Sequence, residues 1–145
     1  MIHRATNLIA DYFEQVGIPC KVREIADRNL SEVETGFSGD EVKDVIVHFL
    51  SNSDKTDVSV RVFKYGDIRI TPSNRGPVLQ ALNHMNNRFR FAKFEIHTDN
   101  TIIVEYDLPQ ETEEDDVGKV CREILVRFQD ILDRAYPEIS DAAMS

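Results

Sequence analysis

The sequence has little of what marks several common protein classes. Its 145 residues include no tryptophan, six glycines, and two cysteines, Cys20 and Cys121, that stand far apart. With no C-x-x-C motif and no regularly spaced histidines, a zinc ribbon is excluded, and we expect reduced, mostly buried thiols. Reduced thiols fit a cytoplasmic protein, and the cytoplasm is the predicted location.

Basic charge is also scarce. The 17 lysines and arginines face 26 acidic residues, which gives a formal net charge of -9. The average field of such a chain repels phosphate backbones and anionic lipid headgroups. The longest apolar runs are only a few residues long, and the first residues are amphipathic. We therefore expect no nucleic-acid partner and no membrane association.

What the sequence does contain is typical of a folded globular protein. Hydrophobic residues make up 41% and charged residues 30% of the chain. A chain of this length suits one domain that buries roughly 70% of the surface exposed when unfolded. No linker or repeat divides it. We predict a single domain over residues 1–137 and a flexible tail over residues 138–145.

Apolar residues three and four positions apart predict three helices. The first helix ends at Gly17, where a glycine satisfies a left-handed helix end. The last follows an acidic run at residues 111–116, which lacks the alternating ligand spacing of a calcium loop and stabilises the helix dipole instead. Tyr136-Pro137 is predicted to end that helix. The three predicted helices cover residues 2–16, 78–89 and 117–135.

Alternating apolar and polar residues predict strands between these helices. The segment Glu32–Phe37 either continues the first strand or pairs with it. The expected fold is α+β: a mainly antiparallel five-stranded sheet with helices packed on it, in the order helix, three strands, helix, two-stranded hairpin, helix. The predicted extended segments are residues 20–25, 32–37, 42–50, 58–63, 68–70, 94–96 and the strand after the hairpin turn.

The turn of the hairpin can be predicted by matching faces. A two-residue loop at Asp99-Asn100 would pair Ile96 with Ile103 and divide the apolar side chains between both faces. A three-residue loop, with Asn100 left-handed, pairs Ile96 with Ile102 and Phe94 with Val104. All the apolar side chains then share one face, so we predict the three-residue loop.

The segment LNHMNNRFRF begins as helix and ends as strand, and the change is predicted near Arg88–Phe91. Its arginines and phenylalanines are typical of a base-stacking surface, but a strand entry whose phenylalanines fill the core is the favoured interpretation. Asn83 and Asn86 cost helix propensity, which often indicates hydrogen bonds to neighbouring backbone or to a partner. Capping of the helix end is the default interpretation of Asn86.

Other polar residues form no recognisable site. The loop Gly36–Gly39 has no lysine and no helix directly behind it, so it is a poor phosphate cradle. Cys121 lies on the apolar stripe of the last helix, so we expect it to be a small buried hydrophobic residue and not a nucleophile. The histidines lie on four different elements and form no local metal pair, so surface or boundary positions are expected for them. They are His3, His48, His84 and His97. No catalytic residue, cofactor or metal is predicted.

The order of elements, together with several motifs, resembles the YbjN family, whose fold resembles that of type III secretion chaperones. The motifs are the L-N-x-x-N element Leu82–Asn86, the F-x-x-F-x-I entry into the strand, the closing Asp107-Leu108-Pro109, and the ending Asp133–Pro137. The resemblance covers nearly the whole chain. It implies a small cytosolic α+β protein, often dimeric, associated with bacterial sensory regulation or chaperone-like binding, without a catalytic centre.

Two functions from different classes follow. The first is a non-enzymatic homodimer that binds an unknown protein or peptide partner. Its candidate interface is Val78, Leu82, Met85, Phe89 and Phe94, although each of these is equally well explained as core. The alternative is a small-molecule sensor or unrecognised enzyme, with a pocket formed by residues such as Arg61, Arg69, His97 and Tyr106. A third possibility is a domain that only supports a complex.

Overall fold

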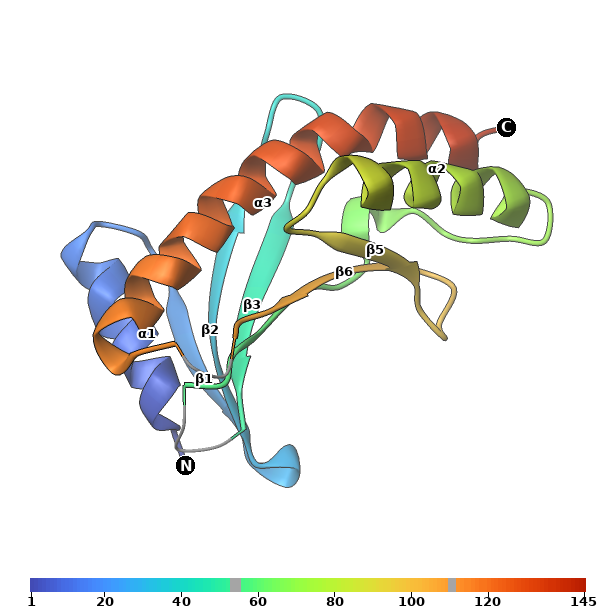
Figure 1. Ribbon diagram of the computed structural model, residues 1–145. Coiled ribbons are helices and arrows are strands. Elements are labelled where there is room, and N and C mark those ends of the chain that lie inside the picture. The colour runs from blue at the N-terminus through green and yellow to red at the C-terminus, as the bar shows by residue number, and fades with distance from the viewer. Residues whose placement is uncertain (53–55, 110–111) are drawn as a thin grey trace. The chain divides into compact units, whose positions relative to one another are not determined.

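The computed structural model describes residues 1–52, 56–109 and 112–145. Within them, three α-helices accompany a six-stranded sheet of order β1-β2-β3-β4-β6-β5, in which β1–β2, β3–β4 and β5–β6 pair antiparallel (Figure 1). The predicted α+β class is confirmed, whereas the predicted count of five strands is one too few. The elements are α1 (Arg4–Gln15), β1 (Lys21–Ile25), β2 (Leu30–Phe37), β3 (Val45–Ser51), β4 (Ser59–Val62), α2 (Arg75–Arg88), β5 (Lys93–Ile96), β6 (Ile102–Asp107) and α3 (Glu114–Ala143).

The additional strand arises because residues 32–37 pair with the first strand and do not continue it, a choice that the sequence did not decide. A 3-10 turn at Ala26–Arg28 and a left-handed Asn29, with φ 52°, reverse the chain between β1 and β2. The two strands therefore pair, with Lys21 opposite Glu34 and Ile25 opposite Leu30. The prediction of a strand at residues 68–70 is wrong, because that segment has no regular secondary structure. It makes one backbone hydrogen bond, from the Ile70 N–H to the Asn100 carbonyl, but is not part of the sheet.

The chain forms two compact units, each assembled from three stretches that interleave along the sequence. Because the stretches interleave, neither unit is a separable segment of chain. The prediction of one domain over residues 1–137 stays a prediction. Unit 1 comprises Met1–Gly36, Ile46–Arg61 and Tyr106–Val126, and unit 2 comprises Phe37–Val45, Val62–Glu105 and Arg127–Ser145.

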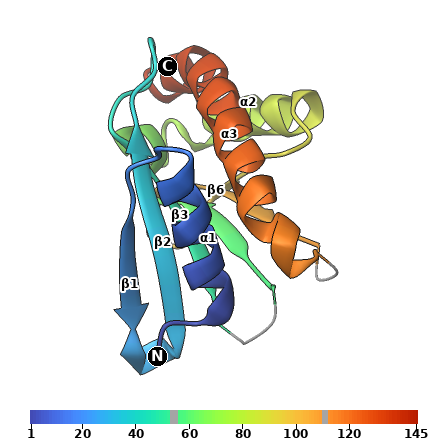
Figure 2. The same cartoon turned by 90° about the vertical axis from the view of Figure 1, so that its left-hand side faces the viewer.

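In unit 1, α1 lies over one face of β1–β3 (Figure 2). Strand β3 alternates, so Val47 and Phe49 are fully buried while Ile46 and His48 point to the opposite face. The ring of Phe13 on α1 meets Phe49 edge to face, with centroids 5.5 Å apart. The sheet of this unit thus has a helix-covered face and an opposite face that carries Ile46 and His48.

Unit 2 has its core around Tyr65, whose ring makes edge contacts with Phe94 at 5.7 Å and Tyr136 at 6.2 Å. The Tyr65 hydroxyl donates a 2.5 Å hydrogen bond to the Leu132 carbonyl. Burial, together with Tyr136 and Asp133, raises the pKa of Tyr65 far above its usual range. In Figure 1, α2 runs beside the C-terminal half of α3.

The predicted hairpin is confirmed residue by residue. Phe94 pairs with Val104 and Ile96 with Ile102, and Asn100 has a φ of 63°. The predicted change from helix to strand is also confirmed, because α2 ends at Arg88 and β5 begins at Lys93.

The predicted end of the last helix at Tyr136-Pro137 is wrong, because α3 continues to Ala143 with Pro137 inside it. A proline inside a helix normally removes a hydrogen bond and clashes with the preceding turn. Here tertiary contacts hold the helix on both sides of the proline. Before it, Tyr65 binds the Leu132 carbonyl; after it, Ile139 is fully buried and Asn74 donates to the Ala143 carbonyl at 3.1 Å.

Candidate functional site

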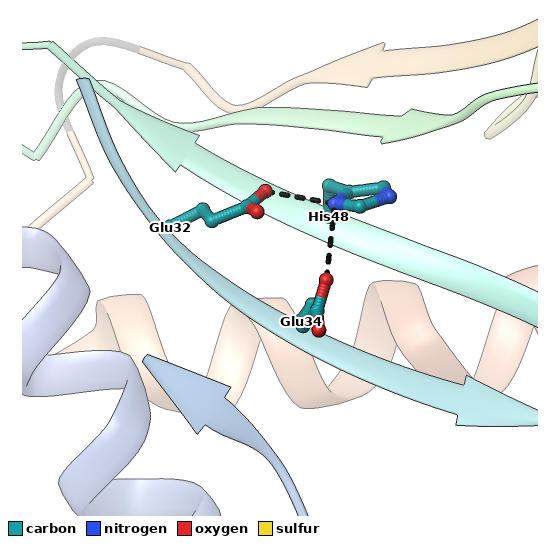
Figure 3. A group of neighbouring side chains, drawn as sticks. All are labelled: Glu32, Glu34 and His48. Atoms are coloured by element: carbon teal, nitrogen blue, oxygen red, sulfur yellow. Dashed lines mark hydrogen bonds and ion pairs between the residues drawn. The ribbon is translucent and has the colours of Figure 1, made fainter. Parts of the chain in front are cut away.

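The face of the unit 1 sheet opposite α1 carries a cluster of three titratable side chains (Figure 3). Glu32 and Glu34 are two residues apart on β2, so both side chains leave the same face of the sheet. His48 approaches them from β3. We call these three residues the Glu-Glu-His cluster. Among the described residues, they are the group of three His, Cys, Asp or Glu side chains whose ligand atoms all lie within 4.8 Å of one another.

The cluster is compact and largely withdrawn from solvent. The Nδ1 atom of His48 lies 2.7 Å from Glu32 Oε2 and 3.9 Å from Glu34 Oε2. The Glu32 side chain is only 3% exposed, against 19% for Glu34 and 18% for His48. A buried carboxylate is costly unless a donor or a cation compensates it, so the contacts of Glu32 decide what this site can do.

A cation already lies beside the cluster. Arg23 stands opposite Glu32 on β1, and its guanidinium nitrogens lie 3.5 Å from Glu32 and 3.6 Å from Glu34. A well-formed arginine–carboxylate pair has N–O distances of about 2.7–2.9 Å. Arg23 is also 56% exposed, so its attraction for the two carboxylates is loose and screened by water.

Two hollows adjoin this part of unit 1 and share Pro19 and Cys20. One, of about 240 Å³, also touches Glu34 and Ile46, and the other, of about 540 Å³, is lined by α1 carboxylates that include Glu14. Ile46 is 47% exposed, so it presents apolar surface at the first of these hollows. Burial, and secondly the Glu14 carboxylate, raises the pKa of the Cys20 thiol, which disfavours the nucleophilic thiolate.

The two end strands of the sheet, β1 and β5, differ in their outer edges. In unit 2, the Asn86 side chain accepts from the Phe94 N–H at 2.7 Å and donates to the Phe94 carbonyl at 3.0 Å. Asn86 thus occupies the hydrogen-bonding groups that a further strand would need at Phe94. The default interpretation of Asn86 as a helix cap is wrong, while the inference that its amide bonds to neighbouring backbone is confirmed.

The five residues of the predicted interface lie in unit 2. Four of them are buried within the single chain, with exposed fractions of 0–3%: Val78, Leu82, Met85 and Phe94. Phe89, at the end of α2, is half-buried, and Leu79, near the start of α2 and outside the predicted five, is 45% exposed. The interface stays a prediction, and Phe89 is the one of its five residues whose side chain is partly accessible on the single chain.

The phenylalanines of the segment at residues 88–94 differ in their burial. Phe94 fills the core, as the favoured interpretation has it. Phe89 and Phe91 are half-buried instead, and arginines stack on them: Arg134 lies 5.4 Å from the Phe89 ring and Arg127 lies 4.3 Å from the Phe91 ring. Both arginines come from α3, so the sequence segment alone could not reveal them.

The residues of the alternative pocket divide between the two units, Arg61 and Tyr106 in unit 1 and Arg69 and His97 in unit 2, and the pocket stays a prediction. Arg61 forms an ion pair with Asp107 at 2.8 Å, whereas Arg69 and His97 are exposed. The expectation of surface or boundary histidines is wrong for His3, which is 2% exposed. Its Nε2 atom lies 2.8 Å from the Asn29 carbonyl oxygen.

The sequence reasoning missed the Glu-Glu-His cluster because it searched for histidines close together in the chain. The ligand atoms come instead from neighbouring strands, 14 to 16 residues apart, as the positions of Glu32, Glu34 and His48 show. The spacing of Glu32 and Glu34 was the one available signal. Two carboxylates at i and i+2 on a strand share a face, whatever lies opposite them.

Comparison with known proteins gives one family. The family model YbjN, described as "Putative bacterial sensory transduction regulator", matches residues 8–141. Neither the curated proteins nor the solved structures contain a match. Among the described residues, no helix is both long and apolar enough to cross a bilayer.

Proposed function

The chain belongs to the YbjN family, and on that premise we propose that it is a regulatory, chaperone-like binding module that holds an extended segment of a protein partner. The segment lies across Pro19-Cys20, which immediately precede β1. The observation that carries this proposal is the pair of hollows that share these two residues, with the exposed Ile46 on one of them.

The chemistry of the hollows defines the partner segment. Their charged lining residues are three carboxylates and one cation: Asp11, Glu14, Glu34 and Lys21. Such a surface attracts a segment that carries lysine or arginine, and the net charge of -9 strengthens the attraction at long range. The hollow beside Ile46, of about 240 Å³, is below the usual 300–1,000 Å³ of ligand pockets and suits one apolar side chain.

The proposed role is non-enzymatic and places the protein in the cytoplasm as a homodimer. Both cysteines have a raised pKa, Cys121 because it is buried, and neither is suited to act as a nucleophile. The proposed dimer uses Phe89, the partly accessible residue of the predicted interface, together with the exposed Leu79 on α2. Light scattering tests it: a mass that stays at one chain over a wide range of concentration removes the dimer from the proposal.

The partner segment is tested by fluorescence anisotropy with two labelled synthetic peptides of about ten residues, one alternating valine and lysine, the other valine and glutamate. We expect saturable binding of the lysine peptide only. The variant Ile46→Lys adds a positive charge at the hollow and should weaken that binding roughly tenfold, about 1.4 kcal/mol. Val126→Lys makes the same charge change at another exposed aliphatic residue, 54% exposed on α3, and should have little effect.

Two results would contradict the proposal. Equal binding of both peptides, or of neither, would refute the basic and apolar character of the partner segment. Equal weakening by Ile46→Lys and Val126→Lys would place the binding outside the hollow, because only a general charge effect acts on both positions.

A further inference from the structure

We propose that the Glu-Glu-His cluster binds one divalent transition-metal ion, through carboxylate oxygens of Glu32 and Glu34 and Nδ1 of His48. The proposal goes beyond the binding of a protein segment and does not depend on it. Water would complete the coordination of an ion at this partly accessible face.

The donor set fits this class of ion. Imidazole nitrogen and carboxylate oxygen are ligands of zinc and its neighbours in the first transition series, whereas calcium and magnesium prefer oxygen ligands alone. Ligand atoms about 2 Å from one ion lie up to about 4 Å apart. The three ligand atoms already lie within 4.8 Å of one another, with separations of 2.7 Å and 3.9 Å from His48 Nδ1. Small side-chain rotations therefore bring them around one ion.

The charge balance also favours an added cation. Glu32 is nearly fully buried beside a second carboxylate, and two such charges need compensation at close range. Arg23 supplies this compensation only at a distance. Its guanidinium nitrogens lie 3.5 Å from Glu32 and 3.6 Å from Glu34, and its own side chain is more than half exposed. An ion held directly by both carboxylates is a closer counter-charge. Arg23 can turn outward into water when the ion binds, so in this proposal it is a competitor of the metal.

The chain supplies a matched control in unit 2. His84 on α2 and Glu138 on α3 have the same contact as His48 and Glu32, with 2.7 Å between Nδ1 and Oε2. That pair is exposed, at 59% and 45%, and no second carboxylate belongs to a three-ligand group with it among the described residues. It has the local chemistry of the cluster without the third ligand.

The test is calorimetric titration of the metal-free chain with Zn²⁺ alone, for the wild type and four variants. We expect one equivalent of Zn²⁺ per chain, and a loss of affinity of roughly tenfold or more in His48→Gln and in Glu34→Gln. His84→Gln should bind as the wild type does. Arg23→Gln, which removes the competing cation, should bind as tightly as the wild type or more tightly. Circular dichroism confirms that each variant is folded.

Three outcomes would overturn the proposal. The first is no saturable binding by the wild type. The second is equal affinity in the wild type, His48→Gln and Glu34→Gln, which would place the ion elsewhere. The third is a loss of affinity in Arg23→Gln equal to that in Glu34→Gln, which would show that the four residues act only as an ion-pair network. Because no peptide enters this titration, its failure leaves the proposed partner segment untouched.

Discussion

The hydrogen bonds between Asn86 and the outer edge of β5 lead to a quantitative prediction. Substitution of Asn86 by alanine removes two hydrogen bonds, of 2.7 Å and 3.0 Å, to the backbone of Phe94. Each such bond contributes about 0.5–1.5 kcal/mol net, and alanine regains up to about 0.7 kcal/mol of helix propensity. The site is only partly buried, so water replaces some of the loss. We expect Asn86→Ala to lower the free energy of unfolding by about 1–2 kcal/mol.

Urea denaturation followed by circular dichroism measures this difference, and Asn83→Ala provides the control. Asn83 lies one turn earlier on α2 and is exposed. Its replacement by alanine should leave stability unchanged or raise it by a few tenths of a kcal/mol, since only helix propensity changes. If Asn86→Ala proves as stable as Asn83→Ala, the closure of the β5 edge by this amide contributes nothing, and the reasoning fails.

Two further predictions concern close approaches and pH. In Gly118→Ala the new Cβ would lie 2.5 Å from Tyr12 Cβ, so we expect the free energy of unfolding, measured with denaturant, to fall by about 1–3 kcal/mol. In the control Gly76→Ala the new Cβ meets nothing within 4 Å, so the free energy of unfolding should rise by about 0.4–1 kcal/mol. Equal effects of the two substitutions would contradict the packing of α3 on α1. Hydrogen bonds from the backbone N–H groups of Val42 and then Glu41 lower the pKa of Asp133. Its stabilising effect is therefore present above the unfolded-state pKa of about 3.9 and is lost as the pH falls through the lower folded-state pKa. The stability difference between wild type and Asp133→Ala, measured by thermal unfolding at a series of pH values, should shrink below about pH 3.9, and a difference independent of pH would refute this.

Sequence reasoning succeeded where a short segment determines its own structure. The hairpin is the clearest case. Only one register puts Phe94 and Ile96 on the same face as Val104 and Ile102, and that register requires the three-residue loop with a left-handed Asn100. The switch from α2 to β5 is equally local, since the period of the apolar residues changes within a few positions. In both cases the physical cause lies within about ten residues of chain, which is the range over which pattern and turn chemistry act.

Features that depend on distant parts of the chain were missed. Pro137 ends a helix by its own chemistry, and α3 continues only because Tyr65, Ile139 and Asn74 hold it from elsewhere. The Glu-Glu-His cluster likewise requires β2 and β3 to lie side by side in one register. Four of the five residues of the predicted interface are buried within the chain. Apolar spacing alone cannot distinguish a helix face that packs on the core from one that binds a partner.

The two outer edges of the sheet are the reason for proposing a partner across Pro19-Cys20 and not an added strand. At β5, Asn86 occupies the outward N–H and C=O of Phe94. At β1 the strand is short and carries Lys21, Arg23 and Glu24, and charged side chains on a short edge strand oppose pairing with another chain. Edge pairing is thus hindered at both ends of the sheet by different means. Beside β1, Ile46 at one hollow and Val22 at the other are accessible apolar side chains, and there the proposed segment would gain apolar contact without needing a free strand edge.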